Sequence, residues 1–514
     1  MKRFDGRVGI ALLLLLAACR EAPVVDSTPA ADQSTHPESS DAPLREARHH
    51  RQPGGCGTLT DAEDPDTLRV SRYHDGVVLY ANAQVGLAIV DVSDPDEPKV
   101  GAASELVGTP IGIFETDGAA IVVVAPWDRP SETIVRAVEV EPRRAGRTLG
   151  EIVLPGAPRD ARRLGDAIVV TRDLPPASTE GSTMTAVTSF MLEGDLLSRR
   201  DELRLPGRGA VTGGSPYGVA VARPAEPELG ADRTSVTWIG VDPELGSLRL
   251  HGTATFSGVV PRWRRASDHV IDVEEDARVR VVACATAACP AGDLAAYAAI
   301  DFSEPDRPRV ASWSLIARAG DGVFGFAGDR LMVARPPAEP IEATDISFFH
   351  TSAGLVPAGT VRVPGTVSSL AARDGSVIAL GWTGSASAGK RAIIHQLDVR
   401  RAPRLVGSTG FGGDWTWSPA YEDERAMSFD PSTTMGALPM TTLRGRTGAV
   451  AAAQVLSFGP SGPRTVMEQE AVADRLLFVE GRLLAFSADG VTTVRHPGER
   501  SFRRRWEDGR TFIR

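Results

Sequence analysis

A unit of short strands and turns recurs along this chain, and it constrains the fold more than any other feature of the sequence. Runs rich in Val, Ile and Leu are bounded by Gly, Pro and Asp, and no apolar pattern with helical spacing is sustained. Such runs predict strands, and their boundaries predict turns. One strand of the unit follows Gly-Asp or Asp-Gly, as at 75–80, 165–170, 328–333 and 374–379. The sequence therefore predicts an all-β fold.

A second strand of the unit alternates in polarity and ends in a turn rich in Asp and Pro. The clearest copy is 87–101, and it returns at 299–310 and, in weaker form, at 396–407. Spacings of about 40 to 60 residues, with roughly four strands in each unit, are typical of a β-propeller. Units start near Asp66, Pro110, Pro158, Gly209, Val260, Gly320, Thr366 and Ser418, with a partial unit near Val472.

A four-stranded sheet cannot bury both of its faces alone, so propeller blades stack face to face around an axis. The units predict about eight four-stranded blades, with seven as the alternative. We expect the partial last unit to take a strand from the beginning of the propeller, which would close the ring. Two packed β-sandwiches are a further alternative, but they leave the recurring turn unexplained.

The first residues have the features of a secretory signal peptide. Lys2 and Arg3 precede an apolar run over 8–16, which is too short for a membrane-spanning helix of about 20 residues. The segment Leu16-Ala17-Ala18-Cys19 resembles the lipobox of bacterial lipoproteins; the alternative is an ordinary signal peptide with a chance cysteine. The resemblance implies a signal peptide over 1–18 and a lipid on Cys19. Arg20 in the next position points to the outer membrane of the cell envelope.

Residues 19–60 consist largely of Ser, Thr, Pro, Ala, Asp and His, so we expect a disordered tether before a propeller over 61–514. The pair His49 and His50 in this tether lacks a third metal ligand. The net charge of −10 argues against a nucleic-acid partner, and no later stretch is long and apolar enough to span a membrane.

Three cysteines are left after the predicted lipidation: Cys56, Cys284 and Cys289. Cys284 and Cys289 flank a short loop between strands, and in an oxidising compartment they could form a disulfide. A zinc site would need four ligands, and no pair of Cys or His with suitable spacing completes one. Cys56 is left over near the end of the tether.

The segment 86–101 resembles the LVIVD repeat of bacterial and archaeal surface propellers. Over most of the chain, the order of the units also resembles the secreted beta-propeller-domain family, whose Gly-Asp-Arg strand start is matched at 328–330 and whose late Trp-containing phrase is similar in shape to 417–429. The chain departs from that family at Glu424, where a histidine would be expected, and at 266–273. The resemblance implies a propeller outside the cytoplasm, without implying a reaction.

The densest mixture of acidic and aromatic side chains lies in a predicted loop at the start of a unit. Its carboxylates could bind a cation, and its rings could stack on a sugar or a peptide. The alternative is a solvated loop whose tryptophans pack between blades. The candidate binding residues are Trp415, Trp417, Tyr421, Glu422, Asp423 and Glu424.

Other polar groups have structural explanations. The acidic run 274–276 is expected to be a hairpin turn, because it lacks the alternating oxygen ligands and glycine of a calcium loop. Asp94 and Asp242, each before a proline, are expected to cap their own turns. No nucleophile elbow, zinc-protease or phosphate-loop motif is present, and the histidines beyond the tether are scattered singly. We expect no catalytic residue, bound metal or cofactor.

The sequence thus favours a lipid-anchored envelope propeller that acts as a non-catalytic binding or scaffolding module for protein partners. A first alternative is a propeller-type hydrolase or lyase that uses carboxylates such as Glu422 and Asp423, which would have to converge on the central channel. A second is a purely structural envelope protein or a subunit of a lipoprotein complex, which predicts an exposed apolar patch. Because fold does not imply function, the sequence does not separate these alternatives.

Overall fold

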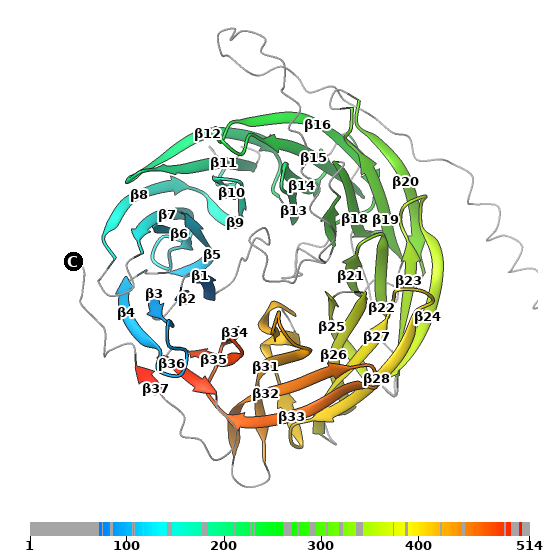
Figure 1. Ribbon diagram of the computed structural model, residues 1–514. Coiled ribbons are helices and arrows are strands. Elements are labelled where there is room, and N and C mark those ends of the chain that lie inside the picture. The colour runs from blue at the N-terminus through cyan, green and yellow to red at the C-terminus, as the bar shows by residue number, and fades with distance from the viewer. Residues whose placement is uncertain are drawn as a thin grey trace, which may run out of the picture.

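The protein is built almost entirely of antiparallel strands arranged as a ring. The computed structural model describes residues 71–505 with gaps, the longest at 141–145, 177–182, 261–269, 287–293, 336–342 and 495–502. Hydrogen bonds join the described strands into eight sheets, of which seven have four strands and one has nine. The sheets follow one another around a common axis in chain order, from blue to red in Figure 1. The chain is therefore a β-propeller, as predicted.

Each sheet consists of consecutive strands, so the chain forms a series of meanders. Meander 1 comprises β1 (Ser71–His74), β2 (Val77–Asn82), β3 (Gly86–Asp91) and β4 (Lys99–Ser104). Meander 2 comprises β5 (Thr109–Thr116), β6 (Ala119–Ala125), β7 (Glu132–Glu139) and β8 (Thr148–Pro155). Meander 3 comprises β9 (Ala157–Leu164), β10 (Ala167–Leu174), β11 (Met184–Glu193) and β12 (Leu196–Pro206). Meander 4 comprises β13 (Val211–Ser215), β14 (Gly218–Pro224), β15 (Arg233–Val241) and β16 (Leu248–Ser257). Meander 5 comprises β17 (Ile271–Val273), β18 (Arg278–Cys284), β19 (Ala295–Asp301) and β20 (Arg309–Ile316). Meander 6 comprises β21 (Val323–Ala327), β22 (Arg330–Arg335), β23 (Ala343–His350) and β24 (Val356–Pro364).

The nine-stranded sheet contains two meanders that a short extra strand connects. Meander 7 comprises β25 (Thr366–Arg373), β26 (Ser376–Ser385), β27 (Gly389–Asp398) and β28 (Arg404–Phe411), and meander 8 comprises β30 (Ser428–Phe429), β31 (Met435–Leu443), β32 (Ala449–Gly459) and β33 (Gly462–Glu470). Between them lie β29 (Trp415–Trp417) and the short 3₁₀ helices η3 (Pro419–Tyr421) and η4 (Glu424–Ala426). Meander 9 comprises β34 (Arg475–Val479), β35 (Arg482–Ser487), β36 (Gly490–Val494) and β37 (Arg503–Arg505).

The eight predicted blades agree with the number of hydrogen-bonded sheets, but the predicted closure of the ring is wrong. The unit near Val472 is a complete four-stranded sheet whose last strand, β37, comes from the C-terminal end of the chain and pairs with β36. At the other end, β1 pairs with β2 in its own sheet. Nothing in the sequence distinguishes a short terminal strand from a missing one, because Arg503–Arg505 has no apolar pattern.

The ring closes by packing between meanders 1 and 9 instead of by a shared strand. Val78, Tyr80 and Val90 belong to the same buried cluster as Phe486 and Leu484. The rings of Tyr80 and Phe486 lie 5.3 Å apart, and the Tyr80 hydroxyl donates to Asp474 Oδ2 at 3.2 Å. Neighbouring sheets therefore bury each other's faces on both sides of the closure.

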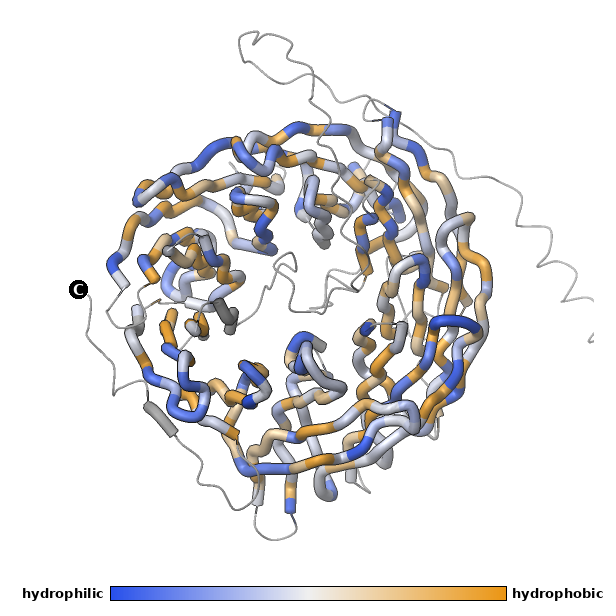
Figure 2. Tube along the Cα trace, in the orientation of Figure 1, coloured by the Kyte–Doolittle hydropathy of each residue, from blue (hydrophilic) through white to orange (hydrophobic). Residues whose placement is uncertain are grey.

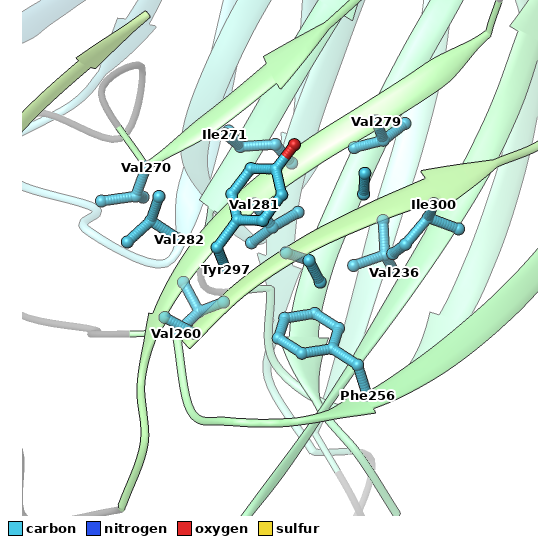
Figure 3. Close-up of a cluster of buried hydrophobic side chains, with 14 of the residues drawn as sticks. Val236, Phe256, Val260, Val270, Ile271, Val279, Val281, Val282, Tyr297 and Ile300 are labelled. Carbon is cyan, nitrogen blue, oxygen red and sulfur yellow. The ribbon is translucent and has the colours of Figure 1, made fainter. Parts of the chain in front are cut away.

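Buried side chains from adjacent meanders form the core throughout the ring. The largest cluster joins meanders 4, 5 and 6, and Figure 3 shows Phe256 of β16 and Val236 of β15 close to Ile300 of β19. On the peripheral strands hydrophilic and hydrophobic residues are interleaved (Figure 2). This is because one face of such a strand packs in the core, whereas the outer edge of its sheet meets solvent, as along β24. This pattern is the physical basis of the sequence periodicity.

Threonine hydroxyls hold the crossovers that lead from one meander to the next. Thr185, at the start of β11, donates to the carbonyl of Gly207 at 2.9 Å and accepts the amide of Gly209 at 2.5 Å. The carbonyls of three more crossover glycines accept in the same way from Thr133, Thr234 and Thr344. The four glycines whose carbonyls accept these bonds have a positive φ, as at Gly207 with φ 86°. The crossovers thus lie at one face of the ring, the crossover face, and side-chain caps fix them.

Aspartates cap turns at the other face, as the sequence indicated. Asp94 Oδ1 accepts the amide of Asp96, and Asp242 Oδ1 accepts the amides of Glu244 and Leu245. The Asp that recurs in the strand phrase has the same function, because Asp301 Oδ1 accepts the amide of Ser303. Hydrogen bonds from Ser303, together with Arg309, lower the pKa of Asp301 to about 2. These carboxylates stabilise turns.

Candidate functional site

The predicted binding loop is partly a strand, β29, that lies between meanders 7 and 8. Its edge pairs antiparallel with the end of β31 and meets β27 at one position, Lys390 opposite Trp415. Side chains alternate along a strand, so Trp415 and Trp417 point to one side and Thr416 to the other. Thr416 is buried, whereas the tryptophans are 38% and 39% exposed. The strand therefore presents two neighbouring indoles to solvent.

The adjacent strand extends this exposed surface. Leu443 of β31 lies directly opposite Trp415 and is 40% exposed. Residues that are directly opposite in an antiparallel pair share a face of the sheet, so Leu443 lies beside the indole of Trp415. We call Trp415, Trp417 and Leu443 the Trp platform. It lies on the crossover face, because β29 follows the outer strand of meander 7 and contacts the ends of the hairpins β26–β27 and β31–β32.

Buried hydroxyl groups hold the platform in place from below. Thr416 Oγ1 lies 3.1 Å from Thr442 Oγ1, which also accepts the amide of Gly413 at 2.6 Å. The hydroxyl of Ser418 donates to the carbonyl of Pro439 at 2.7 Å. Because these groups are buried, the backbone of β29 is fixed and its exposed side chains are held on a rigid support.

Tyr421 is partly buried, unlike the exposed Trp415 and Trp417. Its ring packs edge-on against Trp382 with the centroids 5.4 Å apart, and burial raises the pKa of its hydroxyl above the ordinary range. Lys390 Nζ lies 4.6 Å from the ring centroid of Trp382. Tyr421 and Trp382 therefore pack against each other beneath β29.

The acidic half of the predicted loop is not placed. Glu422 and Asp423 lie outside the described residues, and Glu424 begins η4 with a side chain that is also outside the description. Within the described ranges, no group of three or more His, Cys, Asp or Glu side chains could hold a metal ion. The site that the structure describes is accordingly aromatic.

The predicted anchor and disulfide fall partly outside the structure. Residues 1–70, with the signal peptide, Cys19 and the tether, lie outside the described residues. Cys284 is disulfide-bonded, and Cys289, its predicted partner, also lies outside them. Among the residues from Ser71 onward that the structure describes, no helix has the length and apolarity to cross a membrane.

Sequence reasoning missed Leu443, which lies far from the tryptophans along the chain. The strand sequence Met435–Leu443 carries no local signal that marks Leu443 as exposed. The pattern Trp-Thr-Trp at 415–417 did carry a signal, because alternation along a strand places both indoles on one side. Only the pairing of β29 with β31 brings Leu443 to them.

No protein-family model matches the sequence, and no curated protein matches it. Solved structures match at low identity. The β-propeller domain of the Trilobed protease from Pyrococcus furiosus is 12% identical with a TM-score of 0.33, covering 68% of this chain and 97% of that chain. An uncharacterized protein from Listeria monocytogenes is 10% identical with a TM-score of 0.33, covering 73% and 88%. Sqt1 from Saccharomyces cerevisiae is 10% identical with a TM-score of 0.36, covering 80% and 97%.

These likenesses concern the fold alone. The propeller part of the predicted resemblance agrees with the ring of sheets, and no family match supports its LVIVD-repeat or lipoprotein part.

Proposed function

We propose that this protein is a lipid-anchored propeller of the cell envelope that binds a protein partner through the Trp platform, without catalysis. The observation that carries the proposal is the exposure of Trp415, Trp417 and Leu443 on one face of the β29–β31 pair. Exposed apolar side chains that gather in one place are typical of interaction surfaces, whereas single ones need no explanation.

Tryptophan is the side chain most enriched among residues that dominate binding energy at protein interfaces. A rigid support increases its contribution, because little conformational entropy is lost when the partner binds. The hydroxyl contacts of Thr416 and Ser418 supply that support. The platform thus has the composition and the rigidity of the centre of a protein interface.

The platform is tested with a photo-crosslinking residue in place of Leu443 in cells that make the full chain. We expect a crosslink to one protein, and we expect it to be lost when Trp415→Ala and Trp417→Ala are added. The matched control is Trp127→Ala, which removes another exposed indole whose Nε1 donates to Thr109 on the same face of the ring. Equal crosslinking in the platform variant and the wild type would contradict the proposal.

The lipid anchor is a separate part of the proposal, and its test is independent of the platform. A labelled fatty acid should be incorporated into the wild-type chain and not into Cys19→Ala. Two or more acyl chains anchor a protein almost permanently, so the wild type should fractionate with membranes and the variant should be released. Incorporation of label into the variant would show that Cys19 is not the attachment point.

A further inference from the structure

The Trp platform lies on the face of β31 that packs, further along the strand, against meander 9. Ala437 of β31 and Ala453 of β32 belong to a buried cluster with Leu476 of β34. Side chains alternate along a strand, so Leu443 is on the same face of β31 as Ala437. Its partner Ala449 is on the same face of β32 as Ala453. The platform therefore continues a surface whose other end is part of the core.

Meander 9 does not reach the end of that surface. β31 and β32 have nine and eleven residues, whereas β34, β35 and β36 have five, six and five. Along this face of β31, Pro439 is buried, Thr441 is half-buried and Leu443 is exposed. On β32, burial falls in the same way from Ala453 to Ala449. The two long strands thus overhang meander 9, and their apolar ends at the crossover face are left partly uncovered by the described residues.

The chain leaves meander 9 beside this overhanging end. β37 is the outer strand of its sheet, and its last residue, Arg505, pairs with Gly490 at the start of β36. Gly490 pairs in turn with Ser487 at the end of β35. The first residue of β34 after the crossover, Arg475, pairs with Phe486. Arg505 therefore lies at the crossover-face end of meander 9, whose strands stand next to those of meander 8 in Figure 1.

The next nine residues of the sequence, 506–514, lie outside the described residues, and their reach is sufficient to span the gap to the platform. Adjacent strands lie about 4.8 Å apart and stacked sheets about 10 Å apart, so the path from β37 across its sheet to β34 and on to meander 8 is about 25 Å. Nine extended residues cover about 30 Å.

The segment 506–514 also has the composition of a segment that binds an apolar surface. Three of its nine residues, Trp506, Phe512 and Ile513, are large and apolar. The predicted tether over 19–60 is the alternative within the chain, but it consists largely of small and polar residues and leads to β1 in meander 1. The C-terminal segment therefore matches the Trp platform better in both composition and position.

We propose that residues 506–514 bind to the Trp platform and cover it until a protein partner displaces them. Because β37 holds the start of the segment nearby, its effective concentration at the platform is about millimolar, so a weak contact suffices. A partner binds only the uncovered fraction of molecules, which weakens its apparent affinity by that fraction. The contact itself needs no partner, whereas its regulation of partner binding rests on the proposed function.

The contact is tested with a photo-crosslinking residue in place of Leu443 in the purified, detergent-solubilised chain, with no partner present. We expect an intramolecular crosslink to residues 506–514, mapped by mass spectrometry. Phe512→Ser combined with Ile513→Ser should lower its yield at least about tenfold, as for the loss of a dominant interface residue. The matched control, Arg510→Gln, keeps every apolar side chain of the segment and should leave the yield unchanged. Absence of a crosslink to the segment, or an equal yield in the double variant, would overturn the proposal.

Two further measurements identify the occupant and its effect on the partner. In a mixture of isotopically labelled and unlabelled chains, a crosslink that joins the two kinds would show that a second copy covers the platform, against the proposal. In cells, the double variant should increase the crosslink from Leu443 to the partner severalfold, and an unchanged crosslink would refute the regulation. A crosslink to the segment without any partner crosslink would leave the contact standing and remove the proposed function, and a partner crosslink without a crosslink to the segment would do the reverse.

Discussion

His395 is a fully buried histidine on β27, two residues from Leu397 and therefore on the face of its sheet that packs against meander 6. Its Nδ1 lies 2.7 Å from Ser408 Oγ. Burial lowers its pKa to about 4, because the charged form would lose its hydration. The imidazole is therefore neutral at pH 7 and is an unsuitable general base in that environment, despite its contact with a serine.

This burial predicts a pH-dependent loss of stability that can be assigned to one residue. The unfolded chain binds a proton at His395 near pH 6.5 and the folded chain only near pH 4, so the stabilisation is present above pH 6.5 and is lost as the pH falls toward 4. Between pH 7 and 4.5 the loss is about 2 to 3 kcal/mol. Denaturant unfolding of His395→Gln should show a pH dependence smaller by that amount, and an unchanged dependence would contradict this assignment.

The threonine caps of the crossovers predict a second effect of a single residue. Thr185→Val keeps the shape of the side chain but leaves the carbonyl of Gly207 and the amide of Gly209 without their partner. A buried polar group left unpaired costs about 1 to 3 kcal/mol, so the free energy of unfolding should fall by that amount. The control is Thr465→Val on the exposed outer strand β33, which should change stability by less than about 0.5 kcal/mol. Equal effects of the two substitutions would show that the cap contributes nothing.

Individual elements were predictable where apolar runs alternate regularly. The predicted unit starts at Pro110, Pro158 and Thr366 fall on the first or second residue of β5, β9 and β25. The start at Ser418 is wrong, because β29, η3 and η4 are inserted before β30 begins at Ser428. Hydrophobic periodicity identifies a strand by burial, and a strand with exposed tryptophans has the same local pattern as a buried one.

Because local periodicity does not distinguish exposed strands from buried ones, only some residues of the candidate site could be predicted. The tryptophans of β29 were found because they are rare residues placed two apart, whereas Leu443 is an ordinary strand residue whose exposure depends on its partner strand. Tyr421 was grouped with them by closeness in sequence, but the turn of η3 directs it to Trp382.

Contacts between elements predict a larger effect at the interface of meanders 5 and 6. Arg280 on β18 bonds to Asp272 Oδ2 through Nε at 2.8 Å, and its Nη1 donates to the Gly328 carbonyl and to Thr351 Oγ1 of meander 6, both at 2.7 Å. Arg280→Met should lower the free energy of unfolding by about 3 kcal/mol, at the low end for a buried ion pair because Asp272 is partly exposed. Chemical denaturation measures this loss.

The control for that interface lies in the same sheet. Arg309 pairs with Asp301 at 2.8 Å but is largely exposed, so solvent screens the pair and Arg309→Met should lower the free energy of unfolding far less than Arg280→Met. If Arg309→Met were as destabilising as Arg280→Met, the effect would belong to the loss of positive charge and not to the connection between meanders.

At the scale of the whole molecule, one interface of the ring differs from all the others. Consecutive meanders are connected by a covalent crossover as well as by packing. Within the described residues, meanders 1 and 9 are held by the buried cluster around Tyr80 and Phe486, the ion pair Arg482–Asp96 and the bond from Thr493 to the carbonyl of Pro95. The ring stays a closed disc only while this closure interface holds.

The closure interface therefore predicts where the molecule opens first. Phe486→Ala leaves a cavity against Tyr80 and should cost about 3 to 5 kcal/mol of local stability. Since no crossover connects these meanders, backbone hydrogen exchange should accelerate in β2 and β3 as well as in β35 and β36. The two pairs of strands are almost 400 residues apart along the chain, since Tyr80 and Asp474 are separated by 394 residues. Phe256→Ala, in the large cluster between meanders 4 and 5, is the control and should leave exchange in β2 and β3 unchanged. If Phe486→Ala accelerated exchange only in its own meander, the first and last sheets would be independent, and the ring would owe its shape to the crossovers alone.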